Sequence, residues 1–88
     1  MKLYRIYTEN KNREKIEEEV SKYFEGFTVY EAIGYWKMIK EKSLVIEILT
    51  KNVVESGLEI NVICRAIKSF NEQESILLTL QNIEVVFI

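Results

Sequence analysis

The first part of the chain predicts a strand followed by a helix. Side chains of residues 2–8 alternate between apolar and polar, and this period of two is typical of a β-strand. Asn10-Lys11-Asn12 then supplies a helix N-cap. Apolar residues recur at helical spacing from Ile16 to Phe24, so one stripe of the helix faces a core. Gly26 is the residue type that most often follows a helix end, and we predict that it ends this one.

The middle of the chain predicts an antiparallel hairpin. Residues 27–37 are β-branched and aromatic, which favours a strand. Gly34 within this strand indicates either a bulge or a close approach of another group to the backbone. Residues 38–41 form a short lysine-flanked connection, and residues 43–50 alternate again as the second strand of the hairpin.

A second helix and a final strand complete the pattern. Ser56 and Glu59 have the spacing of a capping box, which predicts the helix start. Apolar residues at helical spacing occupy residues 60–70, and the helix is expected to end near Asn71. The last strand is expected to begin around Glu74.

The order β-α-β-β-α-β predicts an α+β ferredoxin-like fold over residues 1–88 as one domain. Two right-handed crossovers would give a four-stranded antiparallel sheet of order 4-1-3-2, with both helices on one face. The opposite face would then carry an exposed apolar patch made of Leu3, Tyr7, Val45, Leu49 and Leu77.

The last residues, 82–88, form a further β segment that is almost purely apolar. Left unpaired, such a segment would promote aggregation, so it either folds back as a fifth strand or pairs with another subunit. Together with the apolar patch, it leads us to predict a homo-oligomer, a dimer or a trimer, that buries both features.

Composition excludes several kinds of chemistry. The 88 residues include no histidine, aspartate or proline and a single cysteine, Cys64, which falls on the apolar stripe of the second helix. A serine nucleophile would lack a histidine base, and glutamates alone show no metal-ligand spacing, so we predict no catalytic site, metal or cofactor. The net charge of −2 argues against nucleic-acid binding, and no apolar run approaches a membrane span. We expect a cytoplasmic protein, since nothing resembles a targeting segment and one cysteine forms no internal disulfide.

Recognition of an anion is the one chemistry that the pattern favours. Lysines flank the hairpin connection beside two aromatic residues, and such planes next to cations suit a nucleobase with its phosphates. Arg5 belongs to this group, or it pairs instead with Glu47 on the neighbouring strand. The candidate ligand-binding residues are Tyr35, Trp36, Lys37, Lys40, Lys42 and Arg5.

The segment Phe24-x-Gly26-Phe27-Thr28-Val29-x-x-Ala32-x-Gly34-x-Trp36, followed by residues 42–46 and 73–76, resembles a family of small bacterial and phage domains of uncharacterised activity. That family has asparagine and glutamine adjacent after the second helix, whereas Glu72 separates them here, so the resemblance carries no polar site to this position. More distantly, the layout is similar to the trimeric nitrogen-regulatory PII-like proteins. That similarity implies oligomerisation and nucleotide-type ligands in clefts between subunits. The long partner-binding hairpin loop of PII proteins is missing, because residues 38–41 are too few.

We therefore predict a non-enzymatic protein that recognises or sequesters a nucleotide-like anionic metabolite at a subunit interface. The alternative is a protein-interaction or inhibitory module, of the kind that phages and mobile elements encode, that acts through a sheet face or an edge strand. An enzyme using glutamates as acid and base is the third hypothesis.

Overall fold

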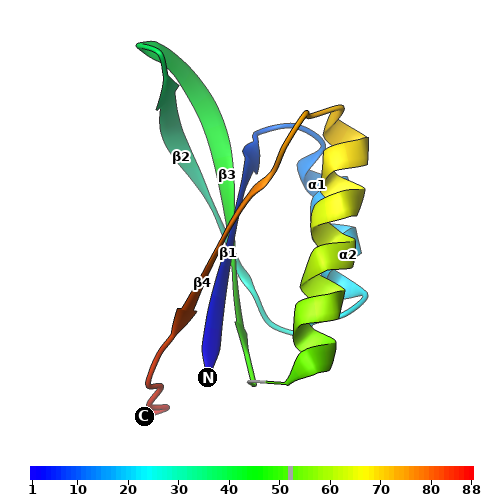
Figure 1. The fold of residues 1–88 in the computed structure, drawn as a ribbon, viewed down its shortest axis with the longest axis vertical. Helices are drawn as coiled ribbons and strands as arrows, with labels where there is room; N and C mark the ends of the chain where they lie inside the picture. The colour runs from blue at the N-terminus through cyan, green and yellow to red at the C-terminus, as the bar shows by residue number, and fades with distance from the viewer. Residues whose placement is uncertain (52) are drawn as a thin grey trace.

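Strands and helices alternate in the order that the sequence predicts. The computed structural model describes residues 1–51 and 53–88. Its elements are β1 (Lys2–Glu9), α1 (Arg13–Ser21), β2 (Thr28–Trp36), β3 (Ile39–Thr50), α2 (Val54–Asn71) and β4 (Leu77–Asn82). The strands form one antiparallel sheet of order β2-β3-β1-β4, and both helices lie on the same face of it (Figure 1). The predicted ferredoxin-like α+β fold and its strand order are thus confirmed.

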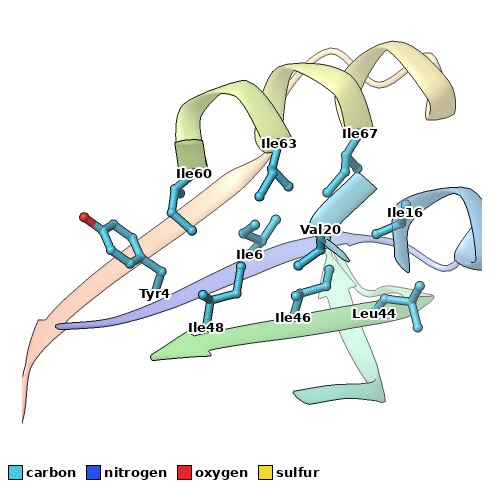
Figure 2. Packing of buried hydrophobic residues seen from close by; sticks show 10 residues of the cluster. All are labelled: Tyr4, Ile6, Ile16, Val20, Leu44, Ile46, Ile48, Ile60, Ile63 and Ile67. Atoms are coloured by element: carbon cyan, nitrogen blue, oxygen red, sulfur yellow. The ribbon is translucent and has the colours of Figure 1, made fainter. Parts of the chain in front are cut away.

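The core lies between this face of the sheet and the two helices, and it consists largely of isoleucine (Figure 2). Alternate residues of β1 and β3 enter it from below, and the predicted stripes of α1 and α2 enter it from above. Each such side chain contributes roughly 1.5–3 kcal/mol when it leaves water. The buried residues of the core are Tyr4, Ile6, Ile16, Val20, Leu44, Ile46, Ile48, Ile60, Ile63 and Ile67.

The opposite face of the sheet, called the open face below, carries no helix. Tyr30, Val45, Tyr7 and Leu77 follow one another across the four strands in a single row. Val45 is only 2% exposed although no helix covers it, and its cross-strand neighbours on either side are the two tyrosines. The predicted apolar patch therefore occupies one face, and its outermost member, Leu77, is 60% exposed.

Helix α1 is shorter than predicted. It ends at Ser21, and the chain turns away where the N–H groups of Tyr23 and Phe24 both donate to the carbonyl of Val20 at 3.0 Å. Gly26 lies beyond this turn and does not have the positive φ of a helix-ending glycine, so its predicted role was wrong. Phe24 packs against the core, which explains why the chain leaves the helix before the glycine.

The two helix starts also differ from the capping prediction. Asn12 does precede α1, but its φ is 54° and its side chain makes no capping hydrogen bond. Helix α2 begins at Val54 without a side-chain cap, and Ser56 is already buried in its first turn. The proposed capping box at Ser56 was therefore wrong.

The hairpin between β2 and β3 is tighter than the predicted connection at residues 38–41. Lys37 and Met38 alone make the turn, with φ values of 48° and 69°, and β3 begins at the next residue. A type I′ hairpin turn requires positive φ at both central positions. The turn was not predicted because the chain lacks the Asn-Gly pair that usually marks such a turn. Lys40 and Lys42 consequently belong to a strand and not to a loop.

Gly34 serves a close approach and not a bulge. The pairing of β2 with β3 runs unbroken past it, with Gly34 opposite Glu41. A Cβ atom at this position would lie 3.2 Å from Ser43 Oγ, which is tighter than an ordinary van der Waals contact. Of the two roles predicted for Gly34, the close approach of another group is therefore the one observed.

The C-terminal residues form no fifth strand within the chain. The N–H of Ile83 donates to the carbonyl of Met1 at 3.0 Å, which adds a single bond to the ladder between β1 and β4. Beyond it, Val86 and Phe87 are 80% and 85% exposed. Pairing of this segment with another subunit stays a prediction.

Replacing Lys37 with Asn and Met38 with Gly should stabilise the protein. Both residues adopt left-handed backbone conformations that cost ordinary side chains about 1 kcal/mol each and that Asn and Gly adopt readily. Urea denaturation should show a gain of about 1–2 kcal/mol in the free energy of unfolding. Met38→Ala is the control and should give no gain. Equal stability of the double variant and the parent would contradict the turn assignment.

Candidate functional site

The six predicted ligand residues do not share one face of the sheet. Tyr35 lies opposite Lys40, and these two together with Lys42 alternate onto the face that carries the helices. Trp36 and Arg5 alternate onto the open face, and Lys37 lies in the hairpin turn. We call Tyr35, Lys40 and Lys42 the helix-side group.

Two members of this group, Lys40 and Lys42, line a recess of about 500 Å³ between the hairpin and the segment before α1, which we call the helix-side recess. Tyr35 does not line it and borders the groove of Trp36 described below. Ile33 contributes an apolar wall, and the backbone N–H of Asn10 donates to the carbonyl of Lys42 at 3.2 Å. Glu31 and Glu41 also line the recess, and Arg13 lies 3.6 Å from the Glu31 carboxylate. Within the described part of the chain Lys40 and Lys42 make no ion pair, so their charges are available to a ligand.

Arg5 is occupied by partners within the protein. Its Nε donates to Glu47 Oε2 at 2.8 Å, and its Nη1 donates to Gln81 Oε1 at 3.0 Å. Tyr30 donates its hydroxyl to the same Glu47 oxygen at 3.1 Å. The alternative expected for Arg5, a cross-strand pair with Glu47, is therefore confirmed.

The Arg5 partnership lowers the pKa of Glu47, chiefly through the hydrogen bond from the guanidinium. Because the pKa of Glu47 is lower in the folded than in the unfolded protein, the pair stabilises the fold at pH values above the ordinary pKa of a glutamate. That contribution is lost as the pH falls through the lowered pKa. Both side chains remain partly exposed, so solvent keeps the contribution small.

Trp36 borders a different depression, a groove of about 710 Å³ at the open face. Tyr7, Gly34 and Ser43 share this groove, whose charged lining residues are Glu9, Glu41, Glu72 and Glu74. No lysine or arginine of the described chain lines it, although Lys37 Nζ lies 5.7 Å from the centre of the Trp36 ring. The negative lining disfavours phosphate, so an anion fits the helix-side recess better.

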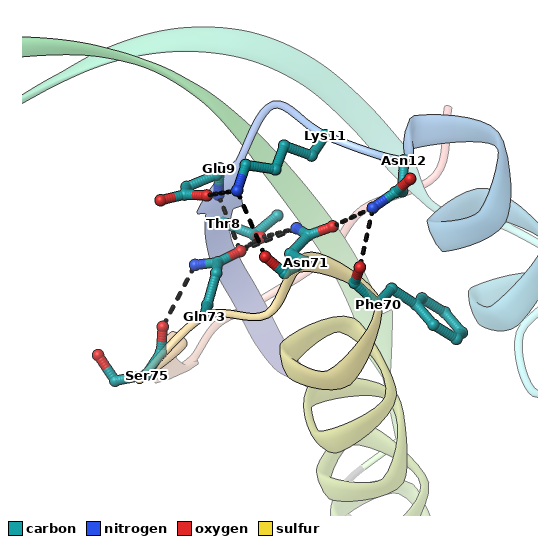
Figure 3. Close-up of polar contacts among 8 residues, drawn as sticks. All are labelled: Thr8, Glu9, Lys11, Asn12, Phe70, Asn71, Gln73 and Ser75. Atoms are coloured by element: carbon teal, nitrogen blue, oxygen red, sulfur yellow. Dashed lines mark hydrogen bonds and ion pairs between the residues drawn. The ribbon is translucent and has the colours of Figure 1, made fainter.

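A buried polar network, which sequence reasoning missed, lies where β1, α1 and α2 meet (Figure 3). Asn71 is 2% exposed and donates to Thr8 Oγ1 at 2.9 Å and to Gln73 Oε1 at 2.8 Å. Thr8 also donates its hydroxyl to the same glutamine oxygen. Glu72 has a φ of 53°, and this turn brings Asn71 and Gln73 together although they are not adjacent. Asn71 and Gln73 therefore belong to one polar network although Glu72 separates them in the sequence.

The same network joins the two helices. Asn12 donates from Nδ2 to Asn71 Oδ1 and to the carbonyl of Phe70, both at 3.0 Å. Lys11 Nζ lies 2.8 Å from Glu9 Oε2 and 3.4 Å from the Asn71 carbonyl. Since the amide groups of Asn71 already bond to protein partners, we interpret the network as positioning the chain around the recess and not as ligand contacts.

The cysteine and the acidic side chains are the remaining candidates for chemistry. Burial raises the pKa of the Cys64 thiol to about 11, so this half-buried side chain stays protonated at neutral pH. Among residues 1–51 and 53–88, acidic and cysteine side chains form no group of three that could hold a metal ion.

No helix in the described ranges is long and apolar enough to cross a membrane.

Residues 5–87 match the family described as protein of unknown function DUF3574. The chain belongs to this family. The match confirms the resemblance to an uncharacterised family. No curated protein matches the sequence.

Solved structures share the fold at low sequence identity. A DUF3240 family protein from Shewanella baltica has a TM-score of 0.71 at 11% identity, with 99% of this chain and 93% of that chain covered. CPII, a nitrogen regulatory PII-like protein from Thiomonas intermedia bound to ADP, AMP and bicarbonate, has a TM-score of 0.68 at 15% identity over the same shares. A phage SAM lyase in complex with S-methyl-5′-thioadenosine has a TM-score of 0.58 at 12% identity, covering 91% of this chain and 79% of that one. The PII-like layout of the chain is confirmed.

Replacing Asn71 with Ala should destabilise the fold by about 2–3 kcal/mol, because it removes the buried hydrogen bonds that the Asn71 amide makes with Thr8, Gln73 and Asn12. Chemical denaturation monitored by circular dichroism measures the loss. Asn61→Ala, on the exposed side of α2, is the matched control and should change stability by less than about 0.5 kcal/mol. An Asn71 variant as stable as that control would disprove the importance of the network.

Proposed function

We propose that this protein binds a nucleotide-like anionic metabolite in the helix-side recess. The observation that carries the proposal is the placement of two lysines without ion-pair partners, Lys40 and Lys42, on the same face as Tyr35 and beside the apolar wall of Ile33. Tyr35 lies outside the lining of the recess but opposite Lys40 on the same face, so its ring can stack on a base that extends from the recess while the ammonium groups meet phosphate or carboxylate oxygens. Trp36 and Arg5 are no part of this recess, since they lie on the open face.

The solved structures of similar fold support this ligand class. CPII was solved with ADP and AMP, and the phage SAM lyase with S-methyl-5′-thioadenosine, so two proteins of this architecture hold an adenosine moiety. Because these proteins are below 25% identical to this chain, they lend the fold and not the binding residues. The helix-side recess provides the charge that such ligands require when they are phosphorylated.

We further propose that the protein binds its ligand without transforming it, so that it sequesters or senses the metabolite. The architecture occurs in a regulatory PII-like protein and in a lyase, and it therefore supports either role. Binding without catalysis is favoured by the side chains present, since the lining of the recess includes lysines, glutamates, an amide and apolar residues but no serine, threonine or cysteine to act as a nucleophile.

A neighbouring subunit would complete the recess at the tip of the hairpin. Met38 is 94% exposed and Ile39 is 63% exposed, and Tyr35 itself is 69% exposed. Exposed apolar side chains of this kind, together with the PII-like layout, favour a ligand held in a cleft between two subunits.

Binding can be measured by thermal shift and calorimetry with AMP, ADP and a panel of cyclic nucleotides. We expect at least one to raise the melting temperature of the parent protein. The double variant Lys40→Glu, Lys42→Glu should bind that nucleotide at least about tenfold more weakly, because both charges oppose the anion. Lys51→Glu, one residue beyond the other end of β3, is a control that reverses a charge away from the recess and should bind normally. The proposal fails when no nucleotide in the panel binds or when the control loses as much affinity as the double variant.

The alternative function, a protein-interaction or inhibitory module, is favoured by one observation. The outer edge of β2 is unpaired, and the adjoining tip exposes Trp36, Met38 and Ile39 by 63% or more. A partner protein could add a strand to this edge and cover the exposed side chains. Affinity capture with the parent and with Trp36→Ala distinguishes the functions, since a partner lost in this variant with nucleotide binding intact supports the module.

A further inference from the structure

The second edge of the sheet, formed by β4, is open for pairing along its whole length. It is the terminal strand of the order β2-β3-β1-β4, and all six of its residues are exposed. The Ile83 N–H points at β1, so strand alternation directs the backbone groups of Leu78, Leu80 and Asn82 away from β1. These N–H and C=O groups are spaced so that a further antiparallel strand could form hydrogen bonds with them.

This edge has none of the usual protection against pairing. From Leu77 to Ile88 the only charged side chain is Glu84, and the segment contains no proline, glycine or lysine. Proteins normally protect an exposed edge with such residues or cover it with a loop. Instead, Leu78 and Leu80 are 38% and 52% exposed on the side of the sheet that carries the helices.

We infer that the β4 edge pairs antiparallel with β4 of a second copy of this chain, across a two-fold axis at Leu80. Leu80 then lies opposite its own counterpart, Leu78 lies opposite Asn82, and Ile76 lies opposite Glu84. Directly opposed residues must point to the same face, so the axis must pass through a residue and not between two. Moving it to Thr79 would set Glu74 against Glu84, and this repulsion disfavours that register.

Charge complementarity identifies a second copy as the occupant. A groove of about 710 Å³ runs between α2 and the segment that leads into β4, where it is lined by Arg65, Lys68 and Ile76. None of its lining residues in the described chain is acidic. In the inferred pairing, the residues after β4 of one copy extend beside this segment of the other. If pairing extends β4 beyond its end at Asn82, Glu84 alternates to the helix side, and its carboxylate then faces Arg65 and Lys68.

The pairing covers the surfaces that remain exposed in one chain. Leu77 would lie opposite Ile83 on the open face, and Val86 would enter the groove beside Ile76 on the helix side. The two sheets would become one continuous sheet of eight strands. The surface lies at the edge opposite the hairpin, so it goes beyond the proposed ligand site and does not depend on it.

Cross-linking tests the register. In a Cys64→Ala background, Leu80→Cys should form a covalent dimer under mild oxidation, because opposed residues of a hydrogen-bonded pair have Cα atoms about 5.5 Å apart. Thr79→Cys is the matched control on the neighbouring residue and should cross-link at least about fivefold more slowly. Equal rates, or faster cross-linking of Thr79→Cys, would overturn the inferred register.

Sedimentation velocity tests the contact itself. The full chain should form at least a dimer at micromolar concentration, and Glu84→Lys should raise the dissociation constant of the β4 contact about tenfold. Adding Arg65→Glu and Lys68→Glu to Glu84→Lys should restore the dimer, because all three charges are then exchanged. A monomeric parent, or a dimer that Glu84→Lys does not weaken, would overturn the inference. Nucleotide affinity measured on the same variants reports on the proposed function separately.

Discussion

Both helices pack against the same face of the sheet, and the other properties of the molecule depend on this one-sided burial. The covered face can be filled with isoleucine and leucine, which supply most of the favourable free energy of folding. The open face must be stabilised within its own plane. Tyrosines on either side of Val45 shield it, and the pair of Arg5 with Glu47 crosses the centre of that face. Apolar residues are consequently left over at the two edges of the sheet, where the candidate interaction surfaces lie.

The polar network around Asn71 closes one end of this arrangement. Without it, the end of α2, the start of α1 and the end of β1 would meet through backbone groups that lack regular partners. One buried amide satisfies three segments at once, so a single side chain determines how the helices are joined. The hairpin strands that bear the helix-side recess extend from the adjoining end of β1.

Strand alternation also separates the charges of the hairpin. Lysines at positions 40 and 42 point to the helix side, whereas the glutamate between them points to the open face. The two depressions on the two sides of this ribbon consequently differ in charge: the helix-side recess has two lysines and two glutamates in its lining, whereas the charged residues that line the Trp36 groove are all glutamates. Strand alternation is also why Trp36 and Arg5 do not lie on the same face as Lys40 and Lys42, with which the sequence grouped them.

The sequence by itself determined the fold, because the periods of two and 3.6 identify strands and helices and the crossover rule orders them. It also predicted the Arg5 pairing, since directly opposed charges follow from register. Only the tertiary structure decided the ends of α1, the two-residue turn at Lys37 and Met38, and the union of Asn71 with Gln73. The end of α1 depends on the packing of Phe24, and the turn depends on left-handed conformations at residues that are neither glycine nor asparagine. Long-range contacts impose such local conformations, and the spacing of residues along the chain does not reveal these contacts.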